Sequence, residues 1–216
     1  APAILSIRDF VETTAPVTIP GRLTLFMELH QTYKDLGVQE PFDSFYSWGE
    51  MLLNDFDELD KYLLNGTELF QNLAEVKLIE ERFSLDEEQK NALEQFWKSV
   101  GSEAKGQTKE AFLKIWETNR QVYGAFKERL WQKGWAYEGM AYRLLAENPE
   151  KGSYEDWQHI MFAGFNALSP SETSIMQYWQ KQGKATIYWD ADTYYLDDHQ
   201  QEAGKFLRHQ FKHNFK

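Results

Sequence analysis

HIMFAGFNALSPSETSIMQYWQKQGKATIYW, at residues 159–189, has the pattern of a strand, a helix and a second strand. Two short apolar runs, at 159–165 and 185–189, flank a strong helix start. There Ser169 is expected to cap the helix, and Glu172 is expected to bond back to it. A strand that is followed by a helix and another strand favours a parallel pair, because the helix returns the chain to its starting edge. The segment therefore predicts a small parallel sheet.

The first residues of the chain also predict a strand. Residues 3–7 (AILSI) are largely apolar, so we expect strands near both ends of the sequence. Ser6 or Asp9 is expected to cap a short helix at 7–13. An apolar strand this close to residue 1 is typical of a segment excised from a longer polypeptide, and a natural edge strand is the alternative.

Most of the remaining chain is helical by its pattern. Apolar residues recur at spacings of three and four, which is the periodicity of an amphipathic helix. Helices are predicted at 21–36, from Phe42 to a stop at 62–66, at 67–82, 84–100, 108–133, 136–147 and 199–213. The predicted fold class is α/β and predominantly helical, with a small parallel sheet interrupted by a large all-α insertion. We assign residues 1–40 and 150–216 to an α/β core and residues 41–149 to the insertion.

Composition and charge narrow the classes of protein that the chain can represent. Aromatic residues make up 16% of the sequence, which is typical of a packed core and not of disorder. Cysteine is absent, which excludes disulfides, thiolate zinc sites and a cysteine nucleophile. No apolar run is long enough to span a bilayer, and no secretion signal is found, so we expect no membrane partner and a cytoplasmic location.

The net charge of −11 argues against a free-standing nucleic-acid binder with a broad basic surface. Nearly all of the acidic excess lies at residues 41–95, where the simplest interpretation is a solvated helical face. Basic residues appear late, and Lys205, Arg208 and Lys212 follow helical spacing on the last predicted helix. Such a stripe is a candidate nucleic-acid-binding surface. The alternative is a set of cations favoured near a helix C-terminus.

Motifs for catalysis are absent from the sequence. It contains no GxxxxGK[ST], GxGxxG, GxSxG or HExxH pattern, so we expect no catalytic residue and no cofactor. Asp190 and Asp192 follow the second strand of the parallel pair, where open sheets place their ligands. Two carboxylates there can hold Mg²⁺ or Mn²⁺ in a small transferase or phosphohydrolase. Two aspartates after a strand are more often turn formers or helix caps, so no metal site is assigned.

Four stretches of the chain resemble a known family. They are residues 45–63 (FYSWGEMLLNDFDELDKYL), 134–140 (GWAYEGM), 162–169 (FAGFNALS) and 189–195 (WDADTYY). Together they are similar to a Bacteroidetes family of PD-(D/E)XK nucleases, large proteins that are AddB-like and RecC-like. In that family an inactivated helicase-like portion comes first, and the nuclease lies at the far C-terminus.

The resemblance implies that the parallel sheet belongs to a P-loop, helicase-like core. The Walker B strand would then end at Ala163 and Gly164, where active helicases carry an Asp and a Glu. Neither residue can ligate a metal or act as a base. The next motif, at 189–193, lacks the glutamine of active helicases. The phosphate-binding loop would precede residue 1, and the nuclease motif would follow residue 216.

The resemblance therefore implies a non-catalytic, helicase-like domain of a DNA-repair nuclease. Its expected partners are DNA, reached through the parent protein, and a helicase subunit. Its expected role is to guide DNA or to dock a partner during double-strand-break processing. Two alternatives remain from the residues themselves: the metal-dependent enzyme built on Asp190 and Asp192, and a helical protein-interaction module.

Overall fold

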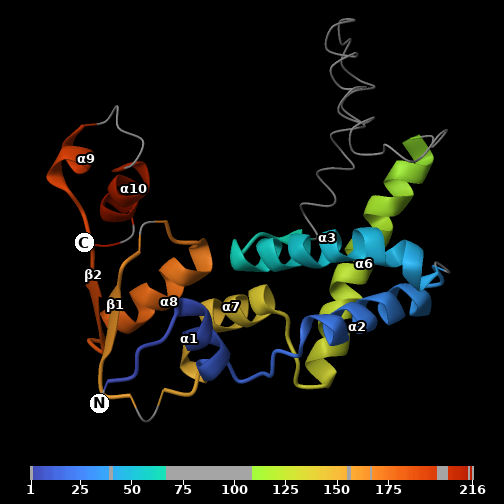
Figure 1. The fold of residues 1–216 in the computed structure, drawn as a ribbon, viewed down its shortest axis with the longest axis horizontal. Coiled ribbons are helices and arrows are strands. Elements are labelled where there is room, and N and C mark those ends of the chain that lie inside the picture. The colour runs from blue at the N-terminus through green and yellow to red at the C-terminus, as the bar shows by residue number, and fades with distance from the viewer. Residues whose placement is uncertain are drawn as a thin grey trace, which may run out of the picture.

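The computed structural model of the chain describes residues 2–38, 41–66, 109–154, 157–165, 167–198, 204–213 and 215. These residues are predominantly helical and include one small parallel sheet (Figure 1). The helices predicted at 67–82 and 84–100 lie outside the described residues. Within the described part of the chain, no helix is long and apolar enough to cross a membrane.

The sheet consists of β1 (Ile160–Ala163) and β2 (Ala185–Tyr188), which run parallel with Ile160 opposite Ala185. Helix α8 (Pro170–Lys181) connects them. Ser169 caps α8 as expected: its hydroxyl accepts a bond from the Glu172 N–H, and the Glu172 carboxylate accepts one from the Ser169 N–H at 2.7 Å. The predicted strand–helix–strand unit and its parallel pairing are confirmed.

The strand predicted at residues 3–7 is wrong, so the sheet does not have strands from both ends of the sequence. Helix α1 (Ile7–Thr14) begins at Ser6, whose side chain accepts a bond from the Asp9 N–H at 3.1 Å. This capping box fixes the start of a helix and confirms the short helix predicted there. Ile4 stays 94% exposed, so the apolar residues before Ser6 contribute little to the core.

Four longer helices follow the predicted pattern. They are α2 (Arg22–Asp35), α3 (Phe42–Lys61), α6 (Lys109–Gln132) and α7 (Glu138–Glu147), and a short 3₁₀ turn, η1 (Pro149–Lys151), follows α7. Gly37 and Gly134 come just after α2 and α6 with φ of +85° and +66°, a backbone region that glycine enters without steric cost. Helix α3 packs against α7, and α2 packs against α6 and α3.

One buried cluster connects α1 to the sheet. The ring of Phe10 on α1 lies 5.6 Å from the ring of Phe162 on β1 and 5.3 Å from that of Trp157. All of these rings belong to a core that also includes the inner faces of α2, α3, α6 and α7. The first helix is therefore held by residues about 150 positions later in the sequence.

Two helices follow β2 at the far end of the molecule from α2 and α6 (Figure 1). They are α9 (Thr193–Asp197), which the sequence pattern did not predict, and α10 (Lys205–His213), which covers the described part of the last predicted helix. The ring of Trp189 lies 5.4 Å from the ring of Phe211 and 5.2 Å from that of Phe215. These contacts attach α10 to the end of β2.

Candidate functional site

The end of β1 carries the two positions that the resemblance aligns with the acidic residues of a Walker B strand. Ala163 is the last residue of β1 and is exposed, and Gly164 follows it with φ of +81°. A methyl group and a hydrogen atom offer no ligand for a cation and no base for a water molecule. This strand end therefore presents backbone and small side chains to solvent.

The two aspartates that follow β2 have different surroundings. Asp192 is the N-cap of α9, and its carboxylate accepts a bond from the Tyr194 N–H at 2.8 Å. Asp190 is exposed. Among the described residues, no group of three or more His, Asp and Glu side chains is placed to hold a metal ion. The structure thus gives Asp192 the capping role that was the alternative to metal binding.

Helix α10 presents an exposed basic stripe. Lys205, His209 and Lys212 are all exposed, and their spacing of four and three residues places them on one side of the helix. No acidic residue occurs in α10. Cationic charge is therefore concentrated on this helix, in a chain whose overall charge is strongly negative.

Arg208 differs from the two lysines of the predicted stripe. It is half-buried, and its guanidinium donates to the main-chain oxygens of Tyr195 and, at 3.0 Å, Asp198. These are carbonyls at the C-terminal end of α9, where a cation is favoured by the helix dipole. Gly204 brings the two helices close, since a Cβ there would lie 1.9 Å from the Tyr195 oxygen. Arg208 thus joins α10 to α9, and Lys205 and Lys212 remain as the exposed cations of the predicted set.

Exposed aromatic rings accompany this stripe, and the sequence reasoning did not single them out. Phe206 on α10 is 54% exposed, and Tyr194 and Tyr195 on α9 are 59% and 41% exposed. The signal was present as aromatic residues interleaved with basic ones in KFLRHQFKH. These exposed rings contribute little to the core, and those of Tyr194 and Tyr195 contact one another at 5.3 Å between ring centres.

A second polar cluster, buried between α3, α6 and α7, was also missed. The Asp60 carboxylate is 0% exposed and accepts bonds from the hydroxyls of Tyr123, at 2.6 Å, and Tyr137. Lys127 donates to the same carboxylate at 2.8 Å. The Nε of Arg143 lies 2.8 Å from it, at an angle that makes the contact ionic and not a hydrogen bond. Burial, and next the negative charge of Asp60, raise the pKa of Tyr123 far above its usual range, so this tyrosine stays protonated.

The prediction of a solvated acidic face on α3 is therefore wrong at Asp60. Asp60 lies four residues after Phe56 and seven after Leu53, so it falls on the apolar side of the helix. The burial of Asp60 could therefore have been predicted from this spacing. A shallow pocket of about 400 Å³ opens beside the cluster, lined by Lys127, Arg143 and the half-exposed ring of Trp131 among others. Both cations already contact the Asp60 carboxylate, and Glu128 also lines the pocket, so no charge there lacks compensation.

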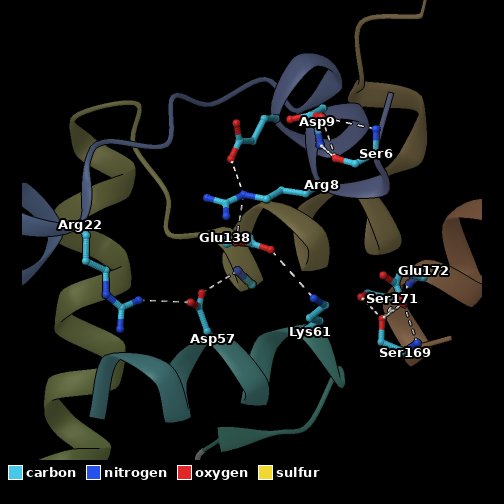
Figure 2. Close-up of polar contacts among 12 residues, drawn as sticks. Ser6, Arg8, Asp9, Arg22, Asp57, Lys61, Glu138, Ser169, Ser171 and Glu172 are labelled. Atoms are coloured by element: carbon cyan, nitrogen blue, oxygen red, sulfur yellow. Dashed lines mark hydrogen bonds and ion pairs between the residues drawn. The ribbon is translucent and has the colours of Figure 1, made fainter. Parts of the chain in front are cut away.

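A third cluster joins α3 to the start of α7 (Figure 2). The Asp57 carboxylate accepts a bond from the Gly139 N–H at 2.7 Å, and Arg22 lies 3.8 Å from it. Arg8 and Lys61 approach Glu138 at 3.4 and 3.9 Å. Burial raises the pKa of Asp57 to about 6, although the Gly139 bond and the Arg22 charge oppose the shift. This cluster fastens the first turn of α7 and holds no reacting group in an open cleft.

Comparison with protein-family models, with curated proteins and with solved structures gives no match for this chain. Its function must therefore be inferred from the residues described above.

Proposed function

We propose that this chain is a non-catalytic, helicase-like part of a larger DNA-processing protein, and that it contacts DNA through α10. In this proposal the sheet of β1 and β2 belongs to a P-loop core that has lost its acidic Walker B residues at Ala163 and Gly164. The chain guides DNA or docks a helicase subunit in the cytoplasm, and cleavage belongs to a nuclease elsewhere in the parent protein.

The observation that carries the proposal is the exposed stripe of Lys205 and Lys212 on α10. The two lysines lie on one helix that holds no carboxylate, and both side chains are exposed, so each can meet a phosphate in solvent. The strand–helix–strand unit supports the helicase-like assignment, because its parallel pairing is the arrangement that such cores use. The residue types at the end of β1 support a role without ATP hydrolysis.

The test is fluorescence anisotropy with a labelled duplex, on the whole chain and on the double variant Lys205→Gln, Lys212→Gln. Two phosphate contacts predict that affinity falls about tenfold between about 50 and 200 mM salt. The double variant should lose most of that salt dependence. A matched control, Lys34→Gln with Lys181→Gln, removes the same charge from exposed positions on α2 and α8 and should bind as the unchanged chain does.

Equal weakening of duplex binding in the α10 variant and the control would show a general charge effect and would refute the proposed interface. Absence of binding at low salt would refute a DNA-contacting role altogether.

A further inference from the structure

We propose that the pocket formed by α6, α7 and the segment after α3 binds a small, neutral, planar ligand with a carboxamide or lactam edge. Its volume of about 400 Å³ is enough for a ring system with its substituents. The inference concerns a surface that the proposed function does not use. It depends on three features of the pocket: an aromatic wall, the room at a glycine inside α6, and the balance of charge.

One face of α6 forms a wall of the pocket. Four pocket residues follow one another on this face at helical spacings of three and four: Gly124, Lys127, Glu128 and Trp131. The ring of Trp131 is 50% exposed, whereas Met140 on α7, which also lines the pocket, is 8% exposed. A half-exposed indole ring beside a buried apolar residue can stack on a planar ligand.

Gly124 leaves room in the pocket that packing does not explain. It lies inside α6, where glycine lowers helix stability relative to alanine. A Cβ at this position would meet no atom of the described residues within 4 Å, so no close contact requires the glycine. Because Gly124 is part of the pocket lining, a larger side chain would narrow the pocket. The glycine therefore keeps the pocket open at a cost in helix stability.

The charges around the pocket balance one another, which favours a neutral ligand. Lys127 and Arg143 each lie 2.8 Å from the Asp60 carboxylate, and Glu128 supplies a second carboxylate. A charged ligand would lose hydration on entering the pocket without meeting an uncompensated charge. A neutral ligand avoids that cost.

Hydrogen-bonding capacity remains on two neighbouring residues of the pocket. The Lys127 ammonium has three N–H donors, and its bonds to Asp60 at 2.8 Å and to the Tyr123 hydroxyl at 3.2 Å use two of them. The Glu128 carboxylate accepts a bond from the Gln132 amide at 2.9 Å, and its oxygens can accept more. A carboxamide or lactam presents an acceptor and a donor side by side, so it can bond to both residues.

The experiment uses three para-fluorinated probes with the same ring: benzamide, benzoate and benzamidinium, which are neutral, negative and positive. Each probe is titrated with the whole chain, and binding is measured from the broadening of its fluorine NMR line. The variants are Gly124→Leu, which narrows the pocket with a good helix former, and Trp131→Leu, which removes the ring. Tyr188→Leu is the matched control, because it removes a similarly exposed ring from β2.

We expect fluorobenzamide to bind with a Kd of about 1 mM and the two charged probes to bind more weakly. Gly124→Leu and Trp131→Leu should each weaken fluorobenzamide binding by about five- to tenfold. Gly124→Leu should also raise the midpoint of thermal unfolding, which separates a loss of binding from a loss of folding. Tyr188→Leu should bind as the unchanged chain does.

Tighter binding of the benzoate or the benzamidinium would overturn the inference, because the charges of the pocket would then not favour a neutral ligand. Unchanged fluorobenzamide binding by Gly124→Leu, or a loss in Tyr188→Leu equal to that in Trp131→Leu, would overturn it because the probe would then bind elsewhere. Absence of fluorobenzamide binding at millimolar concentration would also overturn it. The proposed function is tested separately, through DNA and the lysines of α10.

Discussion

Asp57 and Asp60 lie three residues apart on α3, but they differ in how many hydrogen-bond donors and cations surround the carboxylate. Asp60 is fully buried but surrounded by two hydroxyls and two cations. Asp57 accepts one main-chain bond, and its nearest cation lies 3.8 Å away. Burial therefore dominates at Asp57, and it raises the pKa of this carboxyl to about 6.

The raised pKa makes stability depend on pH. Since the folded state holds a proton on Asp57 more tightly than the unfolded chain does, this residue favours folding below about pH 4, and that contribution is lost as the pH rises to about 6. Asp57→Asn should keep an oxygen for the Gly139 N–H without the charge. The variant should therefore gain about 2–3 kcal/mol over the unchanged chain between pH 4 and pH 7, measured by urea unfolding. A stability difference that stays constant over this range would refute the explanation.

At Asp60 the expected effect has the other sign. Asp60→Asn leaves Lys127 and Arg143 without their carboxylate, and the free energy of unfolding should fall by about 3 kcal/mol. The two cations keep partial access to water, with side chains 24% and 16% exposed, so a larger loss is not expected. Chemical unfolding at neutral pH measures the change. An unchanged free energy of unfolding would mean that water hydrates Lys127 and Arg143 in place of the lost carboxylate.

The candidate site shows how far single residues could be predicted. The exposure of Lys205 and Lys212 on one side of α10 could be predicted from their spacing alone, because it needs no knowledge of the rest of the fold. Arg208 shares that spacing, yet it donates to the end of α9, a helix that the sequence pattern did not predict. The role of Arg208 depends on a contact between α9 and α10, and the spacing of residues along α10 alone cannot predict that contact.

At the scale of elements, two capping boxes of the same type begin α1 and α8. The one at Ser6 is exposed, whereas the one at Ser169 is buried together with its Glu172 carboxylate. Ser6→Ala should cost about 0.5–1 kcal/mol and Ser169→Ala about 1–2 kcal/mol, because Glu172 would lose a partner where water is scarce. Thermal or urea unfolding of the two variants gives the comparison. Equal costs would indicate that water reaches Glu172.

Helices and the parallel pair were predictable because their signals are local. Capping residues, prolines and glycines define the ends of α8, and periodicity defines α2, α3 and α6. Residues 3–7 are also apolar, but in the part of the chain that the structure describes they pair with no strand, and the Ser6 cap begins a helix there instead. A strand needs a neighbour, and whether one is available is a property of the whole fold.

At the scale of the whole molecule, Phe10 connects the first helix to the sheet. Phe10→Ala removes a ring that contacts Tyr154, Trp157 and Phe162, and it should cost about 3–5 kcal/mol. Since these rings belong to the same core as α3 and α6, tryptophan fluorescence and far-ultraviolet circular dichroism should shift to lower urea together. Separate shifts of the two signals would show that α1 and the sheet unfold independently of the other helices.

The contact between Thr18 and the segment after α6 has a consequence for how fast the chain folds. The Thr18 N–H donates to the Gly134 oxygen at 2.9 Å, and the Thr18 oxygen accepts from the Ala136 N–H at 3.0 Å. This pairing closes a loop of more than a hundred residues, and the loss of chain freedom comes before the two bonds can form. Assembly is therefore expected to proceed from the local helices first, with this closure as a late and slow event that limits the folding rate.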